Sequence, residues 1–309
     1  MDKLVSTFSI IARDPASGQL GVAVQSHAFA AGAIVPWAET NVGAVATQAH
    51  CEISYGPLGL DLMRAGKSAP QALAALLAAD EKRDVRQVAM IDRHGNVAVH
   101  TGSRCIASAG HITGENFSVQ GNILANDTVW GKMAAAFQAA KGVDLSEKLM
   151  EALEAGQDAG GDVRGMQAGG IRVVAGPNDP LERTFVTDIR VDDHDRPLVE
   201  MRRVLTVSRG EEWLGMAELA LRNQDLKLAK EYYAKLRGLV VGSREVHFWY
   251  ATTLVEAGYV DEALPIFAEV FAIEPLWHDM IDRLVAVGHF PNNPAVIGKV
   301  KALPVKRSA

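Results

Sequence analysis

The hydrophobic pattern changes near residue 200, and this change divides the chain into two differently built parts. Before it, short apolar runs alternate with turn residues; after it, strand signals stop and apolar residues recur three and four apart up to about Phe290. The first pattern predicts strands with intervening helices, and the second predicts helices alone. A chain of 309 residues is long enough for more than one domain. We therefore predict a mixed α+β domain over residues 1–205, a small all-α domain over 206–290 and a tail over 291–309.

Two β-hairpins constrain the first part. Residues 7–12 (TFSIIA) and 19–26 (QLGVAVQS) flank the turn sequence DPASG, and residues 86–102 contain two apolar runs around a turn at Gly95. Glycine can supply the positive φ that such a turn requires. Helical patterns follow each hairpin. Because hairpins pair strands antiparallel, this order favours antiparallel sheets with helices outside over a doubly wound parallel sheet.

The second part contains an internal repeat of 34 residues, which is the tetratricopeptide period. Helical repeats bury their apolar faces against neighbours. Two copies alone should therefore pack against the first domain, against a second copy of the chain in a homodimer, or against a peptide or protein partner. The equivalent positions are Ala217 and Ala251, Ala229 and Ala263, Tyr233 and Phe267, and Leu239 and Ile273.

Composition excludes several classes of protein. The net charge is −6 and lysine and arginine form no long cluster, which argues against a nucleic-acid partner. The start, MDKLVSTFSIIARDP, predicts a strand and not a secretory signal, and no run of about 18 apolar residues predicts a membrane span. Cys51 and Cys105 have neither zinc-site spacing nor a disulfide framework. We expect a soluble, cytoplasmic protein without a metal or a cofactor.

Many ordered segments of the first part resemble the DUF1028 family of Ntn-hydrolase-like proteins. The resemblance implies an αββα four-layer sandwich, which agrees with the order of strands and helices. Beyond residue 200 the resemblance stops, although some family members carry a C-terminal region described as peptidoglycan-binding. The matching segments are residues 7–10, 12–15, 20–24, 42–49, 55–57, 86–88, 100–102, 109–111, 120–122, 159–165 and 189–194.

The resemblance implies that Thr7 is the candidate nucleophile. In an Ntn hydrolase the side-chain hydroxyl attacks a carbonyl, while the free α-amine of the same residue accepts the proton. An α-amine has a pKa of roughly 7.7–8.0, which suits a general base. Six residues precede Thr7, so its nitrogen is an amide that cannot act as a base. Either the bond between Ser6 and Thr7 is cleaved, or translation starts later, or the mechanism has been lost and Thr7 is an ordinary strand residue.

Four further side chains are candidates for polarising the carbonyl and positioning the substrate. Ser26 and His27 end the second strand, beside Thr7 if the hairpin pairs in register. Gln48 and Asn122 each follow a buried apolar run and could donate amide N–H groups to an oxyanion. The alternatives are a half-buried surface histidine and amides that satisfy loop backbone.

The sequence GGDVRG is the sharpest motif. Its glycines let the backbone approach a ligand, and Asp162 and Arg164 either grip a substrate carboxylate or form an ion pair that fixes the loop. Residues 192–195 (DDHD) suggest a metal site, but neighbours on a strand point to opposite faces, which favours a solvated turn. Cys51, beside His50, is a rival nucleophile.

These patterns predict an amidohydrolase that cleaves a small, anionic or cyclic amide through Thr7. A non-catalytic binding or scaffold protein, which uses the fold and the helical repeats, is the main alternative. A peptidoglycan-binding protein is a third, but it requires export.

Overall fold

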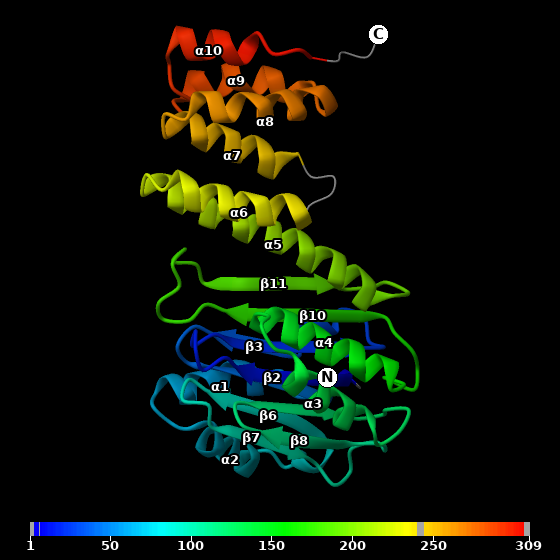
Figure 1. The fold of residues 1–309 in the computed structure, drawn as a ribbon. Coiled ribbons are helices and arrows are strands. Elements are labelled where there is room, and N and C mark those ends of the chain that lie inside the picture. The colour runs from blue at the N-terminus through cyan, green and yellow to red at the C-terminus, as the bar shows by residue number, and fades with distance from the viewer. Residues whose placement is uncertain (1–2, 6, 240–243, 306–309) are drawn as a thin grey trace. The chain divides into compact units, whose positions relative to one another are not determined.

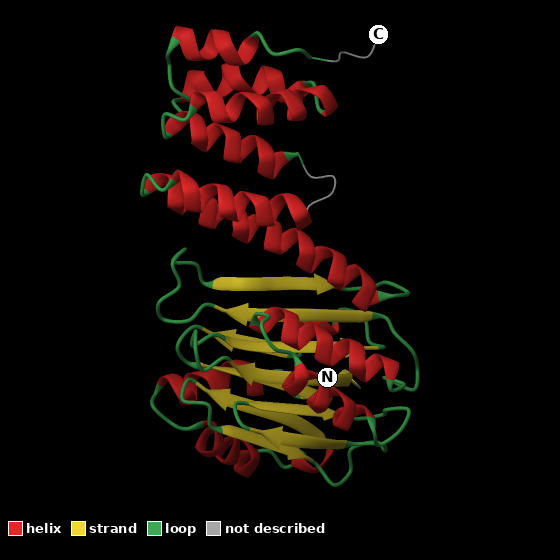
Figure 2. Ribbon diagram, viewed as in Figure 1, coloured by secondary structure: helices red, strands yellow, loops and turns green. Residues whose placement is uncertain are grey.

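The computed structural model describes residues 3–5, 7–239 and 244–305. The chain forms two compact units, residues 1–205 and 206–309, which are described separately below. The first is a mixed α+β unit with two antiparallel sheets, and all the regular structure described in the second is helical, as the colouring of Figure 2 shows.

The first sheet is built around β5 (Gly43–Cys51). β6 lies along one edge of β5, while β1 and β4 pair with opposite ends of its other edge. β7 follows β6 as the predicted hairpin. The bounds of these strands are β1 (Lys3–Val5), β4 (Pro36–Glu39), β6 (Arg86–Asp92) and β7 (Val97–Thr101).

The second sheet has the strand order β11-β10-β3-β2-β9-β8, and every pairing in it is antiparallel. β2 and β3 form the other predicted hairpin and lie at its centre (Figure 1). The strand β8 had no clear signal in the sequence. The bounds are β2 (Thr7–Arg13), β3 (Leu20–Ser26), β8 (Gly110–Gly114), β9 (Phe117–Gly121), β10 (Ala168–Val174) and β11 (Phe185–Val191).

The start of the chain contributes to both sheets. We expected a single opening strand, but β1 pairs with β5 in the first sheet whereas β2 belongs to the second. Residue 6, between them, lies outside the described residues. The side chain of Val5 is fully buried, so β1 is an integral part of the first unit.

Three apolar clusters hold this unit together. One fills the space between the sheets and includes Ile11 and Val24. A second packs Phe8 and Ile10 of β2 against helices α3 (Val129–Ala139) and α4 (Leu145–Asp158), and a third packs β5 and β6 against α1 (Tyr55–Arg64) and α2 (Ala69–Ala79). Because side chains alternate along a strand, β2 faces helices with its even-numbered residues and the other sheet with its odd-numbered residues.

Helix α2 is joined to the first sheet through Asp92. This buried carboxylate accepts hydrogen bonds from the backbone of Ala69, at the start of α2, and from His94 and Asn96 in the hairpin turn. Burial opposes ionisation of Asp92, but these hydrogen bonds outweigh it and lower the pKa of the carboxyl group. Asp92 therefore fixes the turn and the helix together.

The second unit is built from the C-terminal part of α5 and from the helices that follow it. Their bounds are α5 (Pro197–Arg222), α6 (Leu226–Leu239), α7 (Glu245–Glu256), α8 (Val260–Ile273), α9 (Leu276–Val287) and α10 (Pro294–Lys301). The first of these begins in the first unit, and α10 forms in a segment that we had described only as a tail. Among the described residues, no helix combines the length and apolar character needed to cross a membrane.

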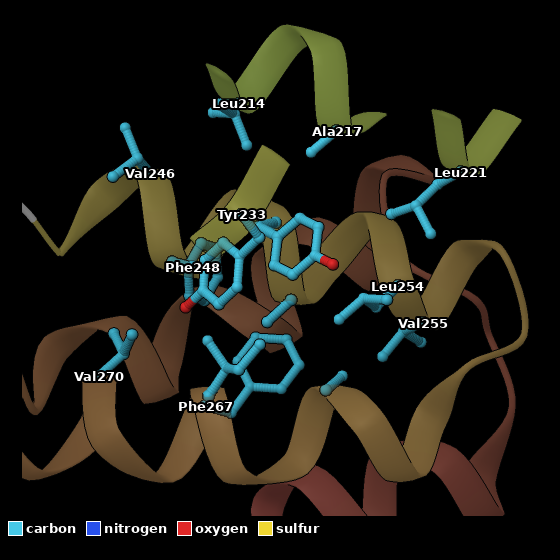
Figure 3. Packing of buried hydrophobic residues seen from close by; sticks show 14 of the residues in the cluster. Leu214, Ala217, Leu221, Tyr233, Val246, Phe248, Leu254, Val255, Phe267 and Val270 are labelled. Carbon is cyan, nitrogen blue, oxygen red and sulfur yellow. The ribbon is translucent and has the colours of Figure 1, made fainter. Parts of the chain in front are cut away.

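The core of the second unit is aromatic. Figure 3 shows Tyr233, Phe248 and Phe267 pointing into the space between the helices. The rings of Tyr233 and Tyr250 stack with centroids 4.0 Å apart, and Phe267 contacts Phe248 at 5.6 Å. The repeat positions Tyr233 and Phe267 are thus buried within this aromatic core.

Three of the four residue pairs related by the 34-residue period are buried at both positions. They are the two alanine pairs and the pair of Tyr233 with Phe267. The fourth pair differs, because Leu239 is half-buried while Ile273 is 52% exposed. The 34-residue repeat is therefore reflected in the burial of three pairs of positions, and not in the pair that ends α6 and α8.

Candidate functional site

Thr7 begins β2 and is fully buried. It alternates with Phe8, which faces the helices, so its side chain faces the first sheet. Its backbone carbonyl accepts a hydrogen bond from the backbone N–H of Asn122 at 3.0 Å. Among the residues that the structure describes, its hydroxyl group has no hydrogen-bond partner. An unpartnered buried hydroxyl costs roughly 1–3 kcal/mol of stability, so Thr7 is not explained by a structural hydrogen bond.

Ser26 lies directly opposite Thr7 in the pairing of β2 with β3, which confirms the register predicted for the hairpin. Residues opposite each other on antiparallel strands share a face of the sheet, so both side chains face the first sheet. His27 follows at the end of β3 and is half-buried. Its Nδ1 lies 3.3 Å from the carbonyl oxygen of Met166. Ser26 therefore borders Thr7 on the β3 side, and His27 is the next residue along the chain.

Asn122 and Gln48 border Thr7 on the other side. Both are buried. Gln48 Nε2 donates to the carbonyl of Thr7 at 3.4 Å and to Gln87 Oε1 at 2.7 Å. Asn122 Nδ2 donates to the same Gln87 oxygen at 2.9 Å, and Asn122 Oδ1 has no partner. Both N–H groups of Gln48 are thus engaged, whereas within the described part of the chain Asn122 Nδ2 uses one of its two protons, in the hydrogen bond to Gln87.

The glycine-rich loop reaches the site through Asp162. This carboxylate is buried and forms a 2.7 Å ion pair with Arg164, whose side chain is 31% exposed. It also accepts hydrogen bonds from the backbone N–H groups of Arg164 and His27. Gly161 and Gly165, which flank the pair, have φ values of +58° and +107°, which favour glycine. Asp162 therefore fixes the loop against the end of β3. Arg164 is the partly exposed charged side chain of this loop.

Behind Thr7, polar side chains continue between the two sheets as a buried hydrogen-bonded network. Ser9 Oγ donates to Gln48 Oε1 at 2.6 Å and accepts from Gln120 Nε2 at 2.6 Å. Ser118 Oγ in turn donates to Gln120. Sequence reasoning missed Ser9, Gln87 and Gln120. Their signals were a polar side chain within a strand, which is informative because buried amides require partners, and a place in the matching segments 7–10, 86–88 and 120–122.

The network ends nearer the surface at His111. Gln87 Nε2 donates to Thr101 Oγ1 at 3.0 Å, and this hydroxyl is 2.9 Å from His111 Nδ1. Burial and the neighbouring His100 lower the pKa of His111. Loss of a proton from His111 is therefore easier than in a free histidine, and the neutral ring is favoured.

The other sequence candidates lie apart from this arrangement. Cys51 Sγ contacts the carbonyl of Thr47 at 3.3 Å, within the apolar cluster between the sheets. In the DDHD segment, Asp192 pairs with Arg190 and Asp193 accepts from Gln167. Among the described residues, no group of three or more histidine, cysteine, aspartate or glutamate side chains is arranged to hold a metal ion.

A family model for "Family of unknown function (DUF1028)" matches residues 7–201, which is more than half of the chain. The chain belongs to the DUF1028 family. A crystal structure of the DUF1028 protein SPO2555 from Silicibacter pomeroyi is similar to it, with 29% sequence identity and a TM-score of 0.60. That similarity covers 66% of this chain and 86% of the SPO2555 chain. A comparison with curated proteins finds no match.

All of the sequence-predicted site residues lie within the DUF1028 match. The match begins at Thr7 itself, so β1 precedes it. The structure thus brings the seven candidates to one end of the two sheets: Thr7, Ser26, His27, Gln48, Asn122, Asp162 and Arg164.

Proposed function

We propose that this DUF1028 protein is an amidohydrolase of the N-terminal nucleophile (Ntn) type, with Thr7 as the nucleophile. The observation that carries the proposal is the fully buried Thr7 hydroxyl without a hydrogen-bond partner. The start of the family match at Thr7 supports it. So does the order of helices, sheet, sheet and helices in the first unit, which fits the αββα sandwich of Ntn hydrolases.

The chemistry requires that Thr7 first become the N-terminal residue. Hydrolysis of the bond before Thr7 consumes one water and releases its α-amine. The amine accepts the hydroxyl proton, directly or through water, as Oγ1 attacks the substrate carbonyl. It then gives the proton to the leaving nitrogen as the C–N bond breaks, which leaves an ester on Thr7. A second water hydrolyses this ester and restores the hydroxyl.

The neighbouring residues take separate roles in this proposal. Asn122 donates its second N–H to the oxyanion, and Gln48 holds the backbone of Thr7 through the carbonyl. Ser26 and His27 position the substrate beside the nucleophile. Arg164, anchored by Asp162, offers a positive charge, which favours a small anionic amide, either open or cyclic.

A non-catalytic binding or scaffold protein is the second candidate, and β1 favours it. This strand pairs with β5 and buries Val5, so the chain is continuous with the first sheet just before Thr7. As long as β1 remains attached, the nitrogen of Thr7 is an amide and cannot serve as a base. The two candidates differ in whether Thr7 ever acquires a free amine.

Intact mass spectrometry of the purified full-length chain separates them. The hydrolase proposal expects a species that begins at Thr7 and that gains the full mass of a β-lactone probe by ring opening on Thr7. Thr7→Val should abolish the adduct, Thr7→Ser should retain it, and Thr47→Val, which alters another buried hydroxyl, should leave it unchanged. A chain that retains the residues before Thr7 and forms no adduct would contradict the proposal and support the scaffold alternative.

A further inference from the structure

Gln87 is a fully buried residue of β6 whose side chain connects the two sheets. Its oxygen accepts hydrogen bonds from Gln48 Nε2 at 2.7 Å and from Asn122 Nδ2 at 2.9 Å. Its nitrogen has two protons, which are shared among three acceptors within hydrogen-bond distance: Gly121 O at 2.8 Å, Thr101 Oγ1 at 3.0 Å and Gly110 O at 3.2 Å. Every polar atom of the Gln87 carboxamide is therefore engaged.

The backbone contacts determine which way the Gln87 amide faces. Gly110 O and Gly121 O are carbonyl oxygens, which only accept, so the NH₂ group must point to them and the oxygen must point away. Gln48 and Asn122 then have to present their own NH₂ groups to that oxygen. The positions of the two other carboxamide oxygens are then fixed. Gln48 Oε1 accepts from Ser9, and Asn122 Oδ1 has no partner among the described residues.

We propose that Gln87 is a positioning residue that sets the carboxamide orientations of Gln48 and Asn122 beside Thr7. Its catalytic meaning rests on the hydrolase proposal above, because a flipped Asn122 would exchange the N–H offered to the oxyanion for a carbonyl oxygen. The positioning itself is a property of the hydrogen-bond network and can be measured without any turnover.

Two substitutions distinguish positioning from simple packing. Gln87→Met keeps a side chain of similar length and removes every hydrogen bond of the carboxamide. Gln87→Glu is more informative, because the protonated acid keeps the carbonyl acceptor for Gln48 and Asn122 and one O–H donor for one of the three acceptors that Gln87 Nε2 meets. The ionised acid places a negative charge against the carbonyls of Gly110 and Gly121. Burial raises the pKa of such a carboxyl group, so the change falls within an accessible pH range.

The experiment follows the side-chain NH₂ signals of Gln48 and Asn122 by NMR in the ¹⁵N-labelled full chain. In the wild type we expect both to exchange slowly with solvent at every pH from about 5.5 to 8.5. In Gln87→Met both should exchange at least about tenfold faster. In Gln87→Glu they should match the wild type at the acid end and lose protection as the pH rises.

Gln25→Met is the matched control. Gln25 is equally buried, lies opposite Phe8 on the helix-facing side of the sheet, and its carboxamide has no hydrogen-bond partner among the described residues. Its replacement should leave both signals unchanged. If Gln87→Met does not fold, the pH dependence of Gln87→Glu carries the test alone. Unchanged Gln48 and Asn122 signals in a folded Gln87→Met chain, or in Gln87→Glu at every pH, would overturn the proposal.

The same variants keep the two proposals apart. If the hydrolase proposal holds, Gln87→Met should slow formation of the β-lactone adduct on Thr7 by about tenfold or more, as expected for a misplaced oxyanion donor. If Thr7 is never freed, no adduct forms in any variant, while the NMR result still decides the role of Gln87.

Discussion

The interiors of the two units differ in the kinds of side chain that fill them. Between the sheets of the first unit, next to apolar side chains, lies a network of fully buried hydroxyl and carboxamide groups, which includes Ser9, Gln48, Gln87 and Gln120. The second unit is held by stacked and tilted aromatic rings, with Phe248 and Phe267 at its centre. The second unit also buries a few polar side chains, such as His247 and Thr252, but the connected carboxamide network lies in the first unit.

This contrast shows where to look for function. Apolar burial contributes roughly 25 cal/mol per Å², so the aromatic core is explained by stability alone. Buried amides contribute little net stability and lose much when a partner is removed. A polar interior is therefore best explained by the precise placement of side chains, and it lies beside Thr7. The following substitutions test the contrast.

Phe267→Ala should have the largest effect. Phe267 is fully buried against Phe248 and Phe271, so truncation leaves a cavity and costs about 3–5 kcal/mol of unfolding free energy. Hydrogen exchange followed on peptides of α7 and α8 should show the loss. Leu276→Ala, at a side chain that is 80% exposed, is the control and should change little. An equally small effect of Phe267→Ala would mean that aromatic packing does not hold the second unit.

Ser9→Ala should have an intermediate effect in the first unit. It removes one hydroxyl but leaves Gln48 Oε1 and Gln120 Nε2 without their partner, which costs about 2 kcal/mol. Denaturant unfolding reported by exchange in β2 and β9 measures the cost. Ser17→Ala, which removes an exposed hydroxyl, should fall near zero. If the two serine variants behave alike, the network is not a cooperative unit.

Thr7→Val should change the free energy of unfolding in the opposite direction. The substitution keeps the shape and removes a buried hydroxyl that has no partner, so stability should stay equal or rise by up to about 1 kcal/mol. Thermal unfolding of the full chain provides the measurement. A clear loss of stability would show that the Thr7 hydroxyl serves a structural hydrogen bond, which would weaken its role as a nucleophile.

The smallest expected effect concerns pH and the second unit. Burial lowers the pKa of His247, and Arg244 and Arg237 add to the effect. The folded state therefore favours the neutral ring, so its contribution to stability is present above the unfolded pKa of about 6.5 and is lost as the pH falls below that value. Comparing unfolding at pH 7.5 and 5.5 for the wild type and His247→Gln should show a smaller acid loss in the variant. Equal losses would exclude His247 as the source.

Several features followed directly from local sequence. The 7–12 and 19–26 runs with their turn predicted the β2–β3 hairpin in register, and the run around Gly95 predicted the β6–β7 hairpin. The periodicity beyond residue 200 predicted helices, and helices are found there. These predictions succeeded because the alternation of apolar residues in strands and their helical spacing are properties of residues close together in the sequence.

Other features had no local signal. The separation of β1 from β2 depends on pairing with β5, about 45 residues further along the chain, and β8 is recognisable only by its partner β9. The helix α10 is short and begins with a proline, yet Val300 is fully buried in the second unit. For β1 the deciding contact lies far away in sequence, and for β8 and α10 it is the packing of a short segment with a weak pattern of its own, so neighbouring residues carried little information.

The sequence by itself thus determined the antiparallel character of the first unit, the helical character of the second, and a set of candidate polar site residues. Only the tertiary structure decided that these residues meet at one end of the sheets, that the Thr7 hydroxyl has no partner among the described residues, and that Gln87 accepts hydrogen bonds from both Gln48 and Asn122. The physical reason is that hydrogen-bond partners buried between two sheets are selected by strand register and sheet packing. Residue type alone specifies only what each side chain can donate or accept.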